Sequence, residues 1–428
     1  MIQRVLSLER SPPAVLSLRF FFTAPLFAML AGAVLLWEGD AAFASRWSPA
    51  VLAATHLLTL GVLTMVICGA LLQLLPVVAG VAVPCAELSA LMMHALLSTG
   101  ALLLAGAFWR SAPPLFAFAL PPLVLGLAWL LVACGAGLWR AASAETAPMV
   151  AAVRMGLVSL APTLVAGAAM AAALAWGLPI PFALLTDLHA LWGLLGWVAL
   201  LVAGVAWQVI PMFQATPLYP PAVSRTLVIF APALLAAGSA AQLAGHPLAV
   251  PLRALLFSVF ALFAVATLIL LARRKRPAPD ATTLFWRLSM ASLLACALVW
   301  YAPLDAAARP LLLGVLFLLG FAGSAVNGML YKIVPFLLWH HWQEHGFGRP
   351  VPGIRLVIPE ACAVAQFHSH ALAVSLLALA ALWPAWLLRP AALALVLSNL
   401  FLGLNLVRAV RCGSRGGAPG AEAPVRIR

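Results

Sequence analysis

Charged side chains are scarce in this chain, which has 24 Lys and Arg but only 11 Asp and Glu among 428 residues. Soluble domains carry about 25% charged residues, whereas this chain carries 8% and is 65% hydrophobic. The composition therefore excludes a soluble protein. It predicts an all-α, polytopic membrane protein, because an apolar run of about 20 residues is long enough to cross a bilayer as a helix.

Several chemical signatures are missing as well. The sequence has no P-loop, no G-x-S-x-G phrase and no dinucleotide fingerprint after a strand. The six cysteines form no C-x-x-C pair, which predicts isolated thiols and argues against a disulfide framework or an iron–sulfur site; they are Cys68, Cys85, Cys134, Cys296, Cys362 and Cys412. The few intramembrane carboxylates do not form the chain that a proton pump would need.

Hydropathy predicts twelve membrane spans. They lie at about 20–37, 50–79, 85–108, 114–138, 152–177, 187–211, 226–245, 250–272, 286–303, 310–338, 360–387 and 390–408. We predict a single integral-membrane domain over residues 1–411, followed by a disordered, basic, cytoplasmic tail at 412–428.

The net charge of +13 is a topology signal. Five basic residues fall in loops on the predicted outer side, namely Arg46, Arg110, Arg253, Arg309 and Arg389. Apart from Lys332, the other 18 fall on the opposite side. The positive-inside rule then places both termini in the cytoplasm. The charge needs no nucleic-acid partner, and the predicted location is a bacterial inner membrane, with the lipid bilayer as the main partner.

One phrase occurs three times, each time near the end of a long span: Gly69-x-x-x-Gln73-x-x-Pro76, Gly204-x-x-x-Gln208-x-x-Pro211 and Gly328-x-x-x-Lys332-x-x-Pro335. The separations of 135 and 124 residues between the Gln or Lys positions match about four helices with their loops. A fixed period predicts repeated units. We therefore predict three pseudo-threefold four-helix units, at about 1–145, 146–280 and 281–411, with Gln73, Gln208 and Lys332 forming a polar core or capping helix ends.

Histidines inside spans are candidate functional residues, because ionisable groups are costly in a membrane. His56 and His189 lie near the predicted outer starts of spans two and six, 17 and 19 residues before their repeat glutamines. A neutral imidazole in apolar surroundings is a natural ligand for haem iron or copper. We predict that His56 and His189 bind such a group, with an interfacial hydrogen-bonded pair as the alternative.

Three further histidines lie in spans. His94 follows Glu87 by seven residues, which places both on one helical face; it is either a metal ligand or part of a polar packing network. His368 and His370 form a His-Ser-His phrase in span eleven. Two residues so spaced point about 200° apart on a helix, so they would face different neighbours. Both are candidate cofactor ligands.

The architecture resembles the catalytic subunit of the haem–copper oxidase superfamily, which also has twelve spans in three units with histidines on helices two and six. The phrases Thr55-His56-Leu57-Leu58-Thr59-Leu60-Gly61 and His189-Ala190-Leu191-Trp192-Gly193-Leu194-Leu195-Gly196 are similar to those of the NnrS branch. The chain departs from these families by having Leu57 after the first histidine, no histidine pair on span seven, and its His-x-His on span eleven.

The resemblance implies haem b, and copper as a further metal, bound in an inner-membrane protein of nitric-oxide, denitrification or respiratory metabolism. Such a protein would act in redox chemistry, sensing or nitric-oxide handling, and its partners would be respiratory or denitrification proteins. Whether it is an enzyme, and whether it forms oligomers, the sequence leaves open. Two other functions also stay open: a cofactor-free transporter or channel lined by the polar core, and a scaffold that assembles a respiratory complex.

Overall fold

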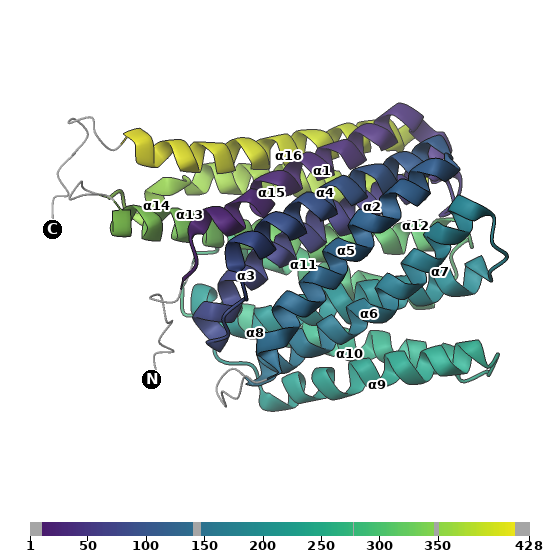
Figure 1. Cartoon of the computed structure of the whole chain (residues 1–428). Coiled ribbons are helices and arrows are strands. Elements are labelled where there is room, and N and C mark those ends of the chain that lie inside the picture. The colour runs from purple at the N-terminus through teal and green to yellow at the C-terminus, as the bar shows by residue number, and fades with distance from the viewer. Residues whose placement is uncertain (1–10, 140–146, 277, 346–350, 416–428) are drawn as a thin grey trace.

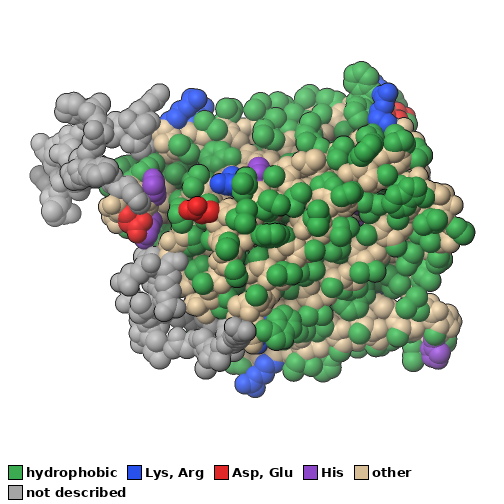
Figure 2. All heavy atoms as spheres, in the orientation of Figure 1, with side chains coloured by type: hydrophobic (Ala, Val, Ile, Leu, Met, Phe, Trp, Pro, Cys, Tyr) green, Lys and Arg blue, Asp and Glu red, His purple; other side chains and the backbone are tan. Residues whose placement is uncertain are grey.

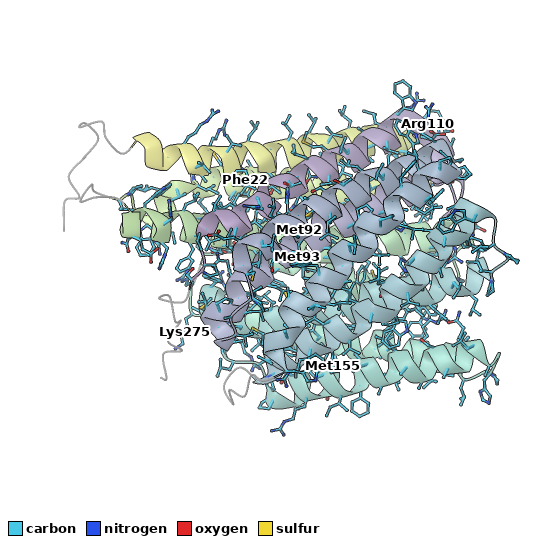
Figure 3. The ribbon with its side chains drawn as sticks, viewed as in Figure 1. Phe22, Met92, Met93, Arg110, Met155 and Lys275 are labelled. Atoms are coloured by element: carbon cyan, nitrogen blue, oxygen red, sulfur yellow. The ribbon has the colours of Figure 1, made fainter. Side chains whose placement is uncertain are left out.

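The computed structural model describes residues 11–139, 147–276, 278–345 and 351–415, and every regular element in these ranges is a helix. Twelve helices are long and apolar enough to cross a membrane, which confirms the predicted all-α, multi-pass class. Both described ends of the chain lie at the same end of the bundle (Figure 1). Lys275 lies at that end and Arg110 at the opposite one (Figure 3), as the distribution of basic residues predicts.

The helices follow one another in antiparallel order. Spans one to four are α1 (Ala14–Glu38) with the short 3-10 turn η2 (Gly39–Ala44), then α2 (Pro49–Leu58), η3 (Thr59–Thr64) and α3 (Met65–Ala79) as one continuous helix, α4 (Ala86–Arg110) and α5 (Pro113–Leu138). Spans five to eight are α6 (Ala147–Trp176), the continuous α7 (Phe182–Ala190), η4 (Leu191–Ala199) and α8 (Leu200–Gln214), α9 (Pro221–Leu243) and α10 (Ala249–Ala272). Spans nine to twelve are α11 (Ala281–Tyr301), the continuous α12 (Ala308–Val315), η5 (Leu316–Gly323) and α13 (Ser324–His345), α15 (Glu360–Ala380) and α16 (Pro384–Arg415), with the short α14 (Ile354–Val357) before α15.

Local chemistry sets several helix ends. Pro49, Pro113 and Pro221 each occupy the first turn of a helix, where a proline costs no hydrogen bond. Gly80 follows the last residue of α3 with a φ of 68°, a left-handed conformation that glycine adopts without strain. The chain can therefore reverse sharply between spans two and three.

The second span of each predicted unit lies at the centre of the bundle. The most apolar stretch of spans two, six and ten is 72%, 78% and 78% buried, whereas no other span exceeds 56%. Hydrophobic side chains cover most of the face of the bundle that Figure 2 shows, as expected for contact with lipid. The three central helices are also those that carry the Gly-x-x-x-Gln/Lys phrase.

The repeated glycines bring each central helix close to the first helix of the same unit. A Cβ at Gly69 would lie 2.7 Å from Phe21 of α1, one at Gly204 would lie 2.6 Å from Ala152 of α6, and one at Gly328 would lie 2.6 Å from Phe285 of α11. Small residues allow such close approach between membrane helices. The same contact thus recurs in all three units.

Each central helix also contains a π-helical segment, which sequence patterning did not predict. The segments η3, η4 and η5 end at Thr64, Ala199 and Gly323. Each end lies nine residues before the polar residue of the repeat (73 minus 64, 208 minus 199 and 332 minus 323). π-bulges are rare and often lie at functional sites. Because they occur at the same position in all three units, the units share this backbone feature as well as the sequence phrase.

One predicted boundary is wrong. Helix α16 continues to Arg415, so residues 412–415 are helical and do not belong to a disordered tail. The apolar pattern ends near residue 408, but Arg408, Ala409 and Arg411 are good helix formers that carry the helix past this point. The rest of the predicted tail, 416–428, lies outside the described residues.

Candidate functional site

The structure brings His56 and His189 together. Their ring centroids are 6.4 Å apart and their planes differ by 25°. Nδ1 of His56 lies 2.8 Å from the Leu52 carbonyl oxygen, and Nδ1 of His189 lies 2.9 Å from the Thr163 carbonyl oxygen. Because a carbonyl only accepts hydrogen bonds, Nδ1 of each ring carries the proton in its neutral form. Each Nε2 therefore keeps a lone pair, the arrangement found in most metal-binding histidines.

The local folding of α2 and α7 positions this pair. His56 lies three residues before the start of η3, and His189 lies two residues before the start of η4. A π segment therefore follows each histidine. The His56 ring also stacks on Phe108 of α4, with centroids 4.9 Å apart. Both histidines are intermediate between buried and exposed as whole residues.

Two features of neighbouring segments hold His189 in place. A Cβ at Gly167 on α6 would lie 2.9 Å from Cε1 of His189, so only glycine leaves space for the ring there. At the adjacent helix end, Arg46 donates to Asp187 over 2.8 Å. This ion pair ties the segment before α2 to α7 and so fixes the first ends of spans two and six beside each other.

Sequence reasoning found the two histidines but missed their partners. Thr163 and Gly167 are four residues apart on span five and therefore lie on one helical face. The pair of small residues was the signal that could have located the site's third helix. Leu52 and Phe108 carry no comparable signal, because an apolar residue in a span has no visible role before the helices are packed.

His94 lies elsewhere, against α1. Its Nε2 is 2.8 Å from Oγ1 of Thr23, and Phe20 meets the ring edge-on with centroids 5.2 Å apart. It approaches neither His56 nor His189 in any contact of the described residues. These contacts make His94 part of the packing between α1 and α4.

His368 and His370 point in different directions, as their spacing on α15 predicts. His368 is exposed at the helix surface, whereas His370 is only 2% exposed. Nδ1 of His370 lies 3.2 Å from Nδ2 of Asn327, and Nε2 lies 3.0 Å from Oγ of Ser324. Both ring nitrogens of His370 are thus occupied by α13.

A small cavity of about 20 Å³ lies beside His370. Its polar wall is formed by His370, Asn327 and Asn399, and its apolar wall by residues such as Val62 of η3 and Leu318 of η5. A space of about 10–15 Å³ is enough for one water molecule when polar partners are present. The cavity therefore suits a single water between the π segments of spans two and ten.

Two of the repeated polar residues, Gln73 and Lys332, bind the start of the first helix of their own unit. Gln73 accepts a hydrogen bond from Ser11 over 3.1 Å and donates to the Pro12 carbonyl over 3.3 Å. Lys332 donates to Asp280, the N-cap of α11, over 2.7 Å. Gln208 is buried in α8 and also has an interaction partner. The contacts of Gln73 and Lys332 are those of helix-end capping within their own units, and a shared central role of the three residues stays a prediction.

The Lys332–Asp280 pair yields a pH-dependent prediction. Burial on its own would raise the pKa of the Asp280 carboxyl, but Lys332 and Thr283 together hold this pKa below its ordinary value of 3.8. The pair's contribution is therefore present above the ordinary pKa and is lost as the pH falls through the lowered one. We expect Lys332→Gln to reduce the free energy of unfolding by about 1–3 kcal/mol at neutral pH, between the values for exposed and buried pairs.

Unfolding in mixed micelles with increasing SDS, at neutral pH and down to about pH 3, measures this effect. The difference between wild type and Lys332→Gln should shrink in acid. Arg253→Gln is the matched control, because Arg253 binds the neutral Gln242 and its loss should cost the same at both pH values. A cost for Lys332→Gln that does not change with pH would contradict the assignment.

The donor set limits which metal centre the site could hold. Among the described residues, no group of three or more His, Cys, Asp or Glu side chains is close enough to share a metal ion. A structural zinc ion needs four protein ligands, which this chain does not supply there. Haem brings four nitrogens of its own, so a pair of histidines such as His56 and His189 would be enough to hold it.

The fold thus defines a multi-pass, all-α membrane protein with two histidines paired near one end of its central helices. No protein-family model matches the sequence, and no curated protein is similar enough to it to count as a relative.

Proposed function

We propose that the chain is a haem-binding membrane protein of the haem–copper oxidase or NnrS type. His56 and His189 would hold haem b in a bacterial inner membrane. The protein would serve nitric-oxide or other nitrogen-oxide metabolism, or respiration, by redox chemistry, sensing or nitric-oxide handling. The observation that carries the proposal is the pair of neighbouring imidazoles whose Nδ1 atoms both face backbone carbonyls.

The spacing of the two rings supports this proposal. Metal–imidazole bonds are about 2 Å long, so two imidazoles that hold one metal through Nε2 have ring centroids up to about 6–7 Å apart. The separation of 6.4 Å between His56 and His189 is compatible with this value. The same separation would also allow the two imidazoles to hold a single copper ion, which is the further metal that the resemblance implies.

A bound haem would supply reversible one-electron chemistry at this site. The chain itself would provide two neutral imidazole ligands, each kept in one tautomer by its backbone carbonyl. Phe108 and the apolar helices around it would exclude bulk water from the site. Gly167 would leave the space on α6 that the His189 ring occupies.

The test is an absorption spectrum of the detergent-purified protein, oxidised and dithionite-reduced, with metal analysis of the same sample. We expect wild type from haem-replete cells to show a Soret band and about one haem per chain. His56→Ala and His189→Ala should each lose or shift this band, because one protein ligand is removed. His246→Ala is the control, since His246 lies in an exposed loop and should leave the spectrum unchanged.

A colourless, metal-free wild-type protein would refute the haem proposal, and so would unchanged spectra in both ligand variants. Thr163 and Leu52 act through their backbone, so no side-chain substitution removes their bonds. Gly167→Ala offers a subtler probe, because its methyl group would press on the His189 ring and should alter the band without removing a ligand.

The transport alternative finds no support in the polar repeat residues. Gln73 and Lys332 both bind the start of a neighbouring helix, and a pore-lining residue would instead face an open passage. Uptake by vesicles that contain Lys332→Gln would test this alternative. A selective change in uptake at unchanged stability would revive it.

A further inference from the structure

The face of α10 that is turned away from the bundle carries an exposed apolar stripe. Leu262, Val265 and Ile269 are 46%, 43% and 46% exposed, and their spacings of three and four residues place them on one side of the helix. Figure 1 shows α9 and α10 along one edge of the bundle. The stripe lies in the half of α10 that leads to Lys275, which Figure 3 places at the end of the bundle where the termini lie.

Basic residues follow directly at the end of this stripe. Arg273 is the C-cap of α10, and its amide donates a hydrogen bond to the carbonyl oxygen of Ile269, so Arg273 continues the same side of the helix. Arg273, Lys275 and Arg276 are all exposed. Their side chains make no ion pair or hydrogen bond with the described residues. The apolar stripe of α10 thus leads into a cluster of three unpaired cations.

The loop that carries these cations is held by two contacts with neighbouring spans. The guanidinium group of Arg274 donates to Oγ1 of Thr283 on α11, and the amide of Lys275 donates to the carbonyl oxygen of Ala215, just after α8, over 3.1 Å. Asp280, the nearest carboxylate that follows along the chain, is engaged in an ion pair of its own. The loop therefore presents its cations in a fixed place, and a ligand that binds preorganised groups loses less entropy.

The length of α10 places these cations at the depth of lipid headgroups. The helix has 24 residues, about 36 Å at 1.5 Å per residue, and the hydrocarbon core is about 30 Å thick. A centred α10 therefore extends about 3 Å beyond the hydrocarbon at each end, and the headgroup layer continues for about 5–8 Å. Arg273 and the loop after it fall in this layer. The stripe from Ile269 to Leu262 lies about 1–12 Å inside the hydrocarbon.

We propose that this end of α10 binds one anionic phospholipid of the leaflet on the side of the termini. Its phosphate would accept charge-assisted hydrogen bonds from Arg273 and Arg276, and Lys275 would add to the attraction. One acyl chain would cover the stripe from Ile269 to Leu262. A soluble acidic partner would meet the cations without the stripe, whereas an amphiphile with an anionic head matches both parts. The proposal does not depend on haem binding.

Native mass spectrometry of the full chain in detergent tests this site. The probes are phosphatidylglycerol and phosphatidylcholine with the same acyl chains, which both carry a phosphate but differ in net charge. We expect wild type to bind one phosphatidylglycerol at least about tenfold more strongly than phosphatidylcholine, because each cation near the membrane surface attracts an anionic headgroup. The double variant Arg273→Gln/Arg276→Gln should lose most of this preference, and Arg273→Lys/Arg276→Lys should keep part of it.

A second double variant, Arg355→Gln/Arg408→Gln, is the matched control for general charge attraction. Both residues are exposed cations in the third unit, on α14 and α16, so the variant removes the same charge from another part of the surface. It should leave the preference for phosphatidylglycerol unchanged. An equal loss in the two Gln double variants, or an unchanged preference in Arg273→Gln/Arg276→Gln, would overturn the proposal.

Two further measurements distinguish the lipid from a soluble anion. Phosphatidylglycerol with six-carbon acyl chains should bind more weakly than the full-length lipid, because less of the stripe is then covered. Millimolar inorganic phosphate should not displace the full-length lipid. Equal binding of the two chain lengths, or displacement by phosphate, would overturn the lipid assignment and make the loop a site for soluble anions. Melting curves without added lipid check that each variant folds, and the Lys double variant keeps the test decisive if the Gln double variant does not.

Discussion

Replacing Gly61 by alanine should lower the free energy of unfolding by about 1–3 kcal/mol, the usual cost of overpacking a tight core. Gly61 lies in the π segment η3 at the centre of the bundle. A Cβ at this position would overlap the Phe27 ring, including its Cγ. Because Cγ lies close to the α1 backbone, Phe27 cannot yield by rotating only the far end of its side chain. Spans one and two would have to move apart.

Gly314→Ala is the matched control for this substitution. Gly314 lies in α12, before the π segment of span ten, and nothing lies within 4 Å of a Cβ there. Alanine favours helix over glycine by about 1 kcal/mol, so this variant should be neutral or slightly stabilised. SDS unfolding in mixed micelles compares the two variants with wild type. Equal stability of the two variants would show that the close contact with Phe27 does not destabilise Gly61→Ala, and would contradict the prediction.

The same test can be extended to the other two units. A Cβ at Gly196 would lie 2.6 Å from Ser159, and one at Gly320 would lie 2.5 Å from Ser292. Both glycines are at the position equivalent to Gly61, 12 residues before Gln208 and Lys332. Their partners have small side chains on the first helices of units two and three. A cost of similar size is expected there, because the Cβ atoms of Ser159 and Ser292 would lie 2.6 and 2.7 Å from the added methyl groups and, unlike the hydroxyls, cannot rotate away.

Much of the architecture follows from the sequence, because hydropathy alone determines which segments are inserted in a membrane. Span two was predicted at 50–79 and forms Pro49–Ala79. Span ten was predicted at 310–338 but continues to Glu344, since polar residues extend a helix beyond the apolar run. The π segments were not predicted, because hydropathy describes side chains and carries no information on which carbonyl each amide reaches.

The candidate site could be predicted less completely. Helical spacing identified His56 and His189 as a matched pair, and the fold brings their rings together. The occupied nitrogens of His370 could not be foreseen, because its partners Ser324 and Asn327 lie more than 40 residues away in the sequence. Pairing between distant spans depends on how helices pack, and one sequence without homologues gives no covariation to reveal it.

His370→Ala should lower the free energy of unfolding by about 2–4 kcal/mol, through a cavity and through polar groups left without partners. Because Asn327 Nδ2 can only donate, Nδ1 of His370 accepts, and the proton must lie on Nε2, which faces Ser324. The Ser324 hydroxyl is then free to donate to the Leu319 carbonyl. Removing the imidazole breaks this series of hydrogen bonds beside the small cavity next to His370.

Two further variants separate the causes. His370→Phe refills the volume without restoring the hydrogen bonds, so it should recover only part of the loss. His368→Ala, on the exposed side of the same helix, should change the free energy of unfolding by less than about 0.5 kcal/mol. SDS unfolding of all three variants measures these differences. Complete recovery in His370→Phe would mean that packing alone matters at this position.

The optical spectrum of His370→Ala then decides between a ligand and a structural residue. A metal at Nδ1 would have to displace Asn327, and a metal at Nε2 would require the proton to move to the other nitrogen. Either change sacrifices a buried hydrogen bond, whereas His56 and His189 offer free Nε2 lone pairs without such a loss. We therefore expect His370→Ala to keep any haem spectrum while losing stability. A lost Soret band at retained stability would instead place a cofactor on α15.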